Sequence, residues 1–316
     1  AVNIVSTDKF PSAFYMYDGV IEDNYAEDWG GGIFLGHANL SDFNNFTDFK
    51  MYGGVIRNNT AGTRGGGVCT GFPDSAEKFA SEVVLNGGSI IGNVCEKGEG
   101  GGIYWDQSSK LYLSNCTITG NSAPNGLGGG VYVDGKYTTG VVFGGCVNIT
   151  GNTSFSDYSG NNGNLYLATE SSSHFLHDYN GSGALSPDSK IGFTAGKINL
   201  GAKIKLNESE NITEELANCF VSDDPFYIIN KEKRSDGYYD LYFAENPSPS
   251  CEPLLTVETK AGGKKEFCSH GAGWMYALEQ VKTTDVTLTL YADWNGRSGN
   301  FDYGEEGSYS GALAIL

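Results

Sequence analysis

The chain has 316 residues, of which 38 are acidic and 20 are basic, so its formal net charge is -18 at pH 7. Binding to a phosphate backbone needs many positive contacts, and this charge therefore argues against a nucleic-acid partner. No run of about 18 apolar residues occurs, which argues against insertion into a membrane. The seven cysteines are too few for a disulfide framework and show no metal-ligand spacing, so we expect no metal and no cofactor.

Five copies of one sequence pattern fill residues 14 to 168. Each copy opens with two apolar residues two positions apart and reaches, through a Gly/Asn turn, an aliphatic residue three positions before an asparagine. The openings are Phe14-x-Met16, Phe49-x-Met51, Val83-x-Leu85, Leu111-x-Leu113 and Val141-x-Phe143, and the later pairs are Ile21 with Asn24, Ile56 with Asn59, Ile90 with Asn93, Ile118 with Asn121 and Ile149 with Asn152. Such a period is typical of a solenoid, in which each unit buries its apolar face against its neighbours.

A glycine-rich segment completes each copy. Four copies carry a glycine triplet and a short apolar strand, at residues 30–35, 65–70, 100–105 and 128–133, and the fifth has Gly163-Asn164-Leu165-Tyr166-Leu167. Three short runs of period two per copy, separated by turn residues, predict three strands per coil. We therefore expect an all-β fold, a right-handed parallel β-helix solenoid whose coils rise by about 4.8 Å.

Stacking of the coils gives the repeated residues a structural role. The apolar positions should form inward columns, one from Met16 to Phe143 and one from Ile21 to Ile149. The asparagines at the repeated turn tolerate left-handed φ and can form an amide ladder along the axis. The glycines allow positive φ or close backbone approach at the next corner. We interpret both sets as scaffold.

The repeat fades after residue 168. Short strands in residues 169–245, among them 190–193, 203–206, 226–229 and 238–243, predict degenerate coils or a cap that covers the open end of the solenoid. The first domain is therefore expected to span residues 1–245. The Pro/Ser-rich residues 246–253 predict a linker. Residues 254–316 are expected to form a small α+β module, with strands at 254–259, 286–292 and 311–316 and a helix at 274–281.

The cysteines leave two pairings open. Cys116 and Cys146 fall near equivalent points of adjacent coils, and Cys251 with Cys268 could close a small loop. An odd number of cysteines leaves at least one free thiol.

Two segments carry a resemblance to a known family. The runs LNGGSIIGNVCEKGEGGGIYW (85–105) and CTITGNSAPNGLGGGVYV (116–133) resemble the Gly-rich repeats of large surface proteins of gut Clostridia, and more distantly the repeats of polymorphic autotransporter adhesins. The resemblance covers about residues 10 to 245. It implies a pectin-lyase-like β-helix fold, a surface location and an adhesin-like role, and it carries no functional residue across.

Parallel β-helices also include polysaccharide lyases and glycoside hydrolases, which need stacked carboxylates. The position that ends the glycine-rich strand offers one such pair, Asp106 and Asp134. Both residues open a turn, where aspartate accepts hydrogen bonds from its own backbone. We favour the turn interpretation, and expect no enzyme, but keep the lyase or hydrolase as an alternative.

A sharper hypothesis comes from alternation along the glycine-rich strand. If Ile33, Ile103, Val131 and Leu165 point inward, an outward column of candidate binding residues remains, broken at Cys69: Phe34, Tyr104, Tyr132 and Tyr166. Exposed aromatic side chains suit sugar faces or an apolar patch of a partner. Two alternatives remain open: stacked aromatics that only stabilise one another, and contact through the variable loops at 36–48 and 71–82.

These observations lead to one functional expectation. We expect a secreted or wall-attached bacterial surface protein, adhesin-like and monomeric, that recognises a host macromolecule. A host protein such as immunoglobulin is favoured over a mucin glycan.

Overall fold

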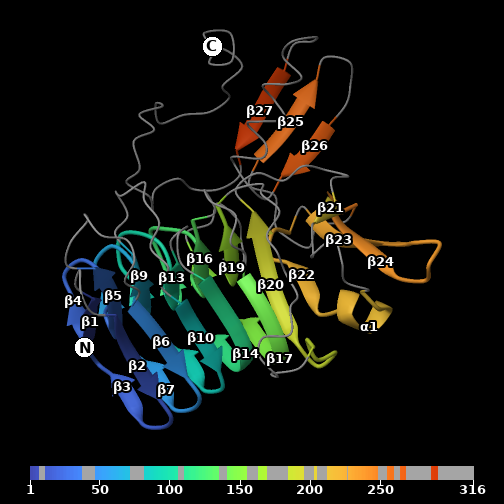
Figure 1. Cartoon of the computed structure of the whole chain (residues 1–316). Coiled ribbons are helices and arrows are strands. Elements are labelled where there is room, and N and C mark those ends of the chain that lie inside the picture. The colour runs from blue at the N-terminus through green and yellow to red at the C-terminus, as the bar shows by residue number, and fades with distance from the viewer. Residues whose placement is uncertain are drawn as a thin grey trace. The chain divides into compact units, whose positions relative to one another are not determined.

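The computed structural model describes residues 1–6, 11–37, 47–71, 82–105, 110–134, 141–154, 163–168, 184–195, 203–204, 212–225, 227–247, 255–259, 264–267 and 286–290. The chain divides into two compact units, residues 1–155 with 162–245, and residues 156–161 with 246–316. The larger unit is a parallel β-solenoid of about 5 turns with almost no helix, which confirms the expected fold class (Figure 1).

Four sets of parallel strands build the coils. The first set is β2 (Ser12–Met16), β6 (Thr47–Met51), β10 (Glu82–Asn86), β14 (Lys110–Thr119) and β17 (Val141–Thr150). The second is β3 (Val20–Glu22), β7 (Val55–Arg57) and β11 (Ser89–Ile91), continued by the second halves of β14 and β17. The third is β4 (Tyr25–Ala26), β8 (Thr60–Ala61), β12 (Val94–Cys95), β15 (Ser122–Ala123) and β18 (Thr153–Ser154). The fourth is β1 (Val2–Ser6), β5 (Ile33–His37), β9 (Val68–Thr70), β13 (Ile103–Trp105), β16 (Val131–Val133) and β19 (Leu165–Leu167).

The third set was not predicted. Its strands are two residues long and directly follow the repeated asparagine, so they are too short to show a period of two. The predicted count of three strands per coil therefore needs one correction, the addition of this short strand.

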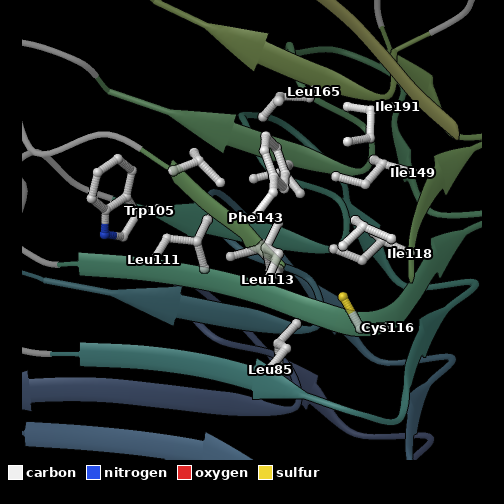
Figure 2. Packing of buried hydrophobic residues seen from close by; sticks show 14 of the residues in the cluster. Leu85, Trp105, Leu111, Leu113, Cys116, Ile118, Phe143, Ile149, Leu165 and Ile191 are labelled. Carbon is white, nitrogen blue, oxygen red and sulfur yellow. The ribbon is translucent and has the colours of Figure 1, made fainter. Parts of the chain in front are cut away.

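The predicted inward columns are confirmed by the register of the strands. Ile21 pairs with Ile56, and the column continues through Ile90, Ile118 and Ile149. From Ile56 onward these side chains are fully buried, and Figure 2 shows Ile118 and Ile149 beside Leu113 and Phe143 from the other column. Burial of each such side chain contributes about 2 kcal/mol to stability. Each coil of the solenoid therefore adds its own share to the stability of the core.

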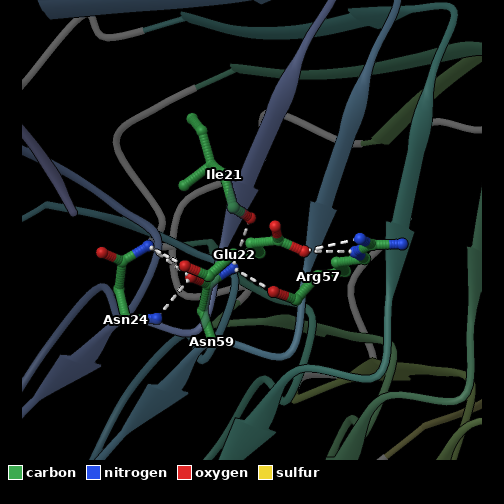
Figure 3. Close-up of polar contacts among 5 residues, drawn as sticks. All are labelled: Ile21, Glu22, Asn24, Arg57 and Asn59. Carbon is green, nitrogen blue, oxygen red and sulfur yellow. Dashed lines mark hydrogen bonds and ion pairs between the residues drawn. The ribbon is translucent and has the colours of Figure 1, made fainter.

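The asparagine ladder is also confirmed. The Nδ2 of Asn24 donates to Oδ1 of Asn59 at 2.8 Å, as Figure 3 shows, and Asn59 donates in the same way to Asn93 at 2.9 Å. The same bond recurs from Asn93 to Asn121, from Asn121 to Asn152 and from Asn152 to Asn164. Each acceptor oxygen also accepts a hydrogen bond from the backbone N–H of the preceding rung. The buried amide groups therefore find partners in the coils on both sides.

The left-handed φ lies one residue before each of the five repeated asparagines, Asn24 to Asn152, which corrects the predicted position. Asp23 and Asn58 have φ values of 57° and 54°, and Gly92, Gly120 and Gly151 have 65°, 65° and 67°. The glycine triplets follow a different constraint. A Cβ on Gly66 would lie 2.4 Å from the carbonyl oxygens of Gly101 and Val94, so close contact between coils requires glycine there.

The C-terminal end of the solenoid is covered. Strand β20 (Lys190–Ala195) pairs with both β17 and β19, and β22 (Phe220–Ser222) pairs with β20. The helix α1 (Glu214–Ala217) and an antiparallel sheet of β21 (Lys203–Ile204), β23 (Tyr227–Lys233) and β24 (Tyr239–Glu245) follow. Leu241 and Phe243 of β24 join the core cluster, so this segment acts as the predicted cap.

The second unit contains an antiparallel sheet in the order β26-β25-β27. Strands β25 (Leu255–Thr259) and β27 (Val286–Leu290) confirm two predicted strands, and β26 (Lys264–Phe267) was not predicted. The predicted helix at 274–281 and strand at 311–316 lie outside the described residues, as do Cys251 and Cys268. Cys116 and Cys146 are free thiols, so the pairing considered for them is wrong.

A buried carboxylate ends the ladder. The Nδ2 of Asn164 donates to Oδ1 of Asp223 at 2.7 Å, and its backbone N–H donates to Oδ2 at 2.8 Å. Burial raises the pKa of Asp223 from 3.8 to about 6, with a smaller rise from Asp224, while the hydrogen bonds from Asn164 and Leu165 lower it. Asp223 is thus the one titratable rung among the described ladder residues.

This carboxylate predicts a pH dependence of stability. Because its pKa is higher in the folded chain, the folded chain binds the proton more tightly than the unfolded chain. The stabilisation is complete below about pH 4 and is lost as the pH rises through about 6. Asp223→Asn should remove this loss and raise the free energy of unfolding at pH 7 by on the order of 2 kcal/mol. Urea unfolding of the native chain and of the variant at pH 4, 5, 6 and 7 measures this effect. If both lose the same free energy of unfolding between pH 4 and pH 7, the prediction is wrong.

Candidate functional site

The predicted binding column lies on one side of the fourth strand set. Phe34 pairs with Cys69, Cys69 with Tyr104, Tyr104 with Tyr132 and Tyr132 with Tyr166. Their inward neighbours, such as Ile103 and Val131, belong to the core cluster and these five do not. The structure therefore brings the four candidate residues into one row on the side of the strands away from the core.

Three tyrosine rings of this row stack face to face. The ring centroids of Tyr104 and Tyr132 are 5.4 Å apart with an interplanar angle of 8°, and those of Tyr132 and Tyr166 are 5.6 Å apart at 9°. We call Tyr104, Tyr132 and Tyr166 the tyrosine stack. The spacing follows from the rise of the coils, which holds equivalent side chains about one strand spacing apart.

Arg64 covers the N-terminal face of the tyrosine stack. Its guanidinium carbon lies 5.0 Å from the centroid of the Tyr104 ring, a cation–π contact. The adjacent member of the column is the small Cys69, which leaves room on this side of Tyr104. Sequence reasoning missed Arg64, although a signal was present: Trp29, Arg64 and Glu99 pair at the position just before each glycine triplet.

Phe34 stands apart from the tyrosine stack. It contacts Trp29, with ring centroids 6.0 Å apart and an interplanar angle of 33°. Trp29 occupies in the first coil the position of Arg64 in the next. The column therefore consists of an aromatic pair near the N-terminal end and a three-ring stack further along, separated by Cys69.

Burial differs along the column. Tyr104 is only 2% exposed, so the expectation that it is open to a partner is wrong, whereas Phe34, Tyr132 and Tyr166 are partly exposed. Burial raises the pKa of all three tyrosines, with Asp134 adding to the rise at Tyr104 and Tyr132. The three phenols are therefore neutral at physiological pH and can donate or accept hydrogen bonds.

The stacking limits what the tyrosine stack can bind. A sugar that packs on an aromatic side chain needs a free ring face, and both faces of Tyr132 are occupied by its neighbours in the stack. Tyr132 can therefore meet a partner only through its ring edge and hydroxyl group, and Tyr166 has one ring face covered by Tyr132. This geometry suits hydrogen bonds and edge contacts to a partner surface.

The candidate acid pair receives no support from the described geometry. Asp134 accepts a hydrogen bond from the Tyr104 hydroxyl, with 3.3 Å between Oη and Oδ2. Asp106 lies outside the described residues. Trp105, between Tyr104 and Asp106, belongs to the core cluster. The role visible for Asp134 is therefore to hold the end of a buried tyrosine.

Within the described ranges, no group of three or more His, Cys, Asp or Glu side chains is placed to hold a metal ion. In the part of the chain that the structure describes, no helix has the length and hydropathy of a membrane span. Comparison with family models, with curated proteins and with solved structures gave no match.

The burial of Tyr104 predicts a structural cost of its removal. Tyr104→Ala deletes a buried ring and should lower the free energy of unfolding by about 3–5 kcal/mol, whereas Tyr104→Phe loses only the bond to Asp134, about 1 kcal/mol. Tyr17→Ala, at an exposed tyrosine, is the matched control and should cost about 1 kcal/mol or less. Chemical denaturation measures the free energy of unfolding of the three variants. Equal stabilities of Tyr104→Ala and Tyr17→Ala would show that the buried ring of Tyr104 does not stabilise the fold.

Proposed function

We propose that this chain is the binding scaffold of an adhesin-like bacterial protein that is secreted or attached to the cell surface and recognises a host macromolecule. The observation that carries the proposal is the tyrosine stack, which holds the partly exposed Tyr132 and Tyr166 at fixed spacing on a rigid solenoid. Tyrosine is enriched at the centres of protein interfaces because it combines apolar area with a hydrogen-bonding end.

The geometry favours a host protein over a glycan. Both ring faces of Tyr132 and one face of Tyr166 are occupied within the stack and are closed to a sugar, while tyrosine hydroxyls in a row can pair with polar groups on a protein surface. The net charge of -18 is consistent with a surface-exposed protein, because such a charge favours solubility and opposes non-specific binding to anionic partners. Immunoglobulin is therefore the first probe, and mucin is the second.

The proposal is for binding and not for catalysis. Asp134 accepts a hydrogen bond from Tyr104. This bond and a position in a turn account for the aspartate, and no substrate is needed to explain it. Release of reducing ends or unsaturated products from a panel of polysaccharides would overturn this part of the proposal.

A binding experiment tests the role of the stack. The chain should bind purified immunoglobulin, or intestinal mucin, in surface plasmon resonance. Tyr132→Phe with Tyr166→Phe removes the hydroxyls of the two partly exposed tyrosines and keeps the rings, so this variant should bind at least about tenfold more weakly with a nearly unchanged melting temperature. Tyr112→Phe, on β14, is the matched control and should bind as the native chain does.

Two results would contradict the proposal. Unaltered affinity in the double variant would remove the tyrosine stack from the binding site. Failure of the chain to capture any protein or glycan, in a pull-down from intestinal secretions and on a glycan array, would contradict the adhesin-like role itself.

A further inference from the structure

Among the arginines that the structure describes, Arg64 alone has a side chain without a polar partner. Arg57 forms an ion pair with Glu22, with 2.6 Å between a guanidinium nitrogen and Oε2 (Figure 3), and Arg234 forms one with Asp236. In the part of the chain that the structure describes, the guanidinium of Arg64 forms neither a hydrogen bond nor an ion pair. Its N–H groups are therefore available to an acceptor from a ligand.

The solenoid holds Arg64 in a fixed place. Its carbonyl accepts a hydrogen bond from the N–H of Gly30 at 3.0 Å, and the residue pairs with Trp29 in the preceding coil and with Glu99 in the next. Its side chain is partly buried and lies against the ring of Tyr104, with 5.0 Å between the guanidinium carbon and the ring centroid. Because the side chain is already ordered, a ligand that binds it loses less conformational entropy.

Glu99, the neighbour of Arg64 in the next coil, does not neutralise it. The two residues pair through their backbones, but no ion pair joins their side chains in the described structure. Burial is the main cause of the raised pKa of Tyr132 and Tyr166, and the charge of Glu99 adds to the rise in both, so this carboxylate lies near the tyrosine stack. Positive charge therefore lies at one end of the stack, and negative charge lies beside its later rings.

A carboxylate is the ligand group that suits Arg64 best. A guanidinium binds a carboxylate through two parallel N–H···O bonds, and partial burial strengthens such bonds. The net charge of -18 and the nearby Glu99 and Asp134 repel a polyanion such as a nucleic acid or a heavily sulfated glycan. A single carboxylate on an otherwise uncharged patch meets Arg64 with the least repulsion.

We propose that Arg64 anchors the binding surface of the tyrosine stack by pairing with an aspartate or glutamate side chain of a partner protein. This inference rests on the proposed function, because it identifies the partner chemistry at the same surface. The guanidinium stacks on Tyr104, and the rings of Tyr132 and Tyr166 follow at successive strand spacings. The acid bound at Arg64 lies about 10–15 Å from partner groups that meet those two rings, a separation that fits within one standard interface.

A protein fits better than a carboxylated glycan as the source of this acid. Both ring faces of Tyr132 and one face of Tyr166 are covered within the stack, which closes them to a sugar ring next to the bound acid. Arg64 itself covers a face of Tyr104. Tyrosine and arginine side by side are instead typical of the centre of a protein interface.

Two peptides test the carboxylate site on the full chain. The probes are acetyl-Gly-Glu-Gly-amide and its glutamine counterpart, and the readout is the NMR signal of the Nε–H groups in isotope-labelled arginine, with Arg64→Lys to assign the signal of Arg64. The glutamate peptide should shift this signal with a Kd on the order of 1 mM, and the signals of Arg57 and Arg234, which already pair with carboxylates, should move much less. An unmoved Arg64 signal, or equal shifts with the two peptides, would overturn the proposal.

Variants of two arginines test the same contact in a protein complex, with immunoglobulin as the probe. Arg64→Gln should weaken binding by at least about tenfold, and Arg64→Lys, which keeps the charge without the two parallel bonds, should weaken it less. Arg57→Gln makes the same change in net charge at an arginine that already pairs with Glu22 and should weaken binding less than about twofold. Equal weakening by Arg64→Gln and Arg57→Gln would show an effect of net charge alone and would contradict the anchor.

The salt dependence of affinity separates an ion pair with the partner from support of the Tyr104 ring. An ion pair across the interface weakens as salt rises, so Arg64→Gln should reduce the salt dependence that the native chain shows. Weaker binding by Arg64→Gln with an unchanged salt dependence would mean that Arg64 only holds Tyr104 in place, and the proposal would be wrong.

Removal of sialic acids from the immunoglobulin identifies the source of the carboxylate. Affinity should be unchanged, and its loss would place the carboxylate on a glycan and overturn the protein partner. The peptide experiment does not use immunoglobulin. A chain that binds the glutamate peptide at Arg64 but captures no host protein would therefore contradict the proposed function and still support the carboxylate site.

Discussion

The hydrogen-bonded column of asparagine side chains is the interaction on which the rest of the structure depends. Each of Asn59, Asn93, Asn121 and Asn152 is fully buried and would be costly to bury without its partners in the adjacent coils. Because the acceptor oxygen of one rung receives both the side-chain and the backbone N–H of the rung before it, a slip of one residue breaks both bonds. The ladder therefore sets the register of the coils, and the isoleucine column and the tyrosine stack follow from that register.

The asparagine ladder continues into the segment that closes the C-terminal end of the solenoid. At the C-terminal end, Asn164 and Asp223 continue the ladder into a cap that covers the core. Asp223 stands three residues after Phe220, the same spacing as Ile21 to Asn24 in the first copy.

Much of this fold could be predicted because its determinants are local and repeated. The spacing of Ile56 to Asn59, recurring in every copy, predicted both the core column and the ladder. The strand that follows each asparagine could not be predicted, since two residues carry no visible period. Asn164 was also missed as a rung, because it follows Asn152 by only 12 residues, outside the repeat spacing.

The sequence predicted that the candidate residues form a row. It did not predict which of them are exposed. Alternation placed Tyr104, Tyr132 and Tyr166 on one side of the strands, and the register confirms it. The burial of Tyr104 depends on Arg64, which comes from a neighbouring coil, and on stacking against Tyr132. Such contacts arise from three-dimensional packing between coils, so no single copy of the repeat reveals them.

The stability of Asn93→Leu tests the role of the ladder most directly, because leucine keeps the volume of the side chain and removes its hydrogen bonds. The ladder account predicts a loss of about 3 kcal/mol or more in the free energy of unfolding, since the buried N–H of Asn59 and carbonyl of Ile56 lose their partners. The control is Asn58→Gly, one position from a rung, where φ is 54° and glycine is compatible; it should change stability by about 1 kcal/mol or less. Asn93→Leu as stable as the native chain would contradict the account.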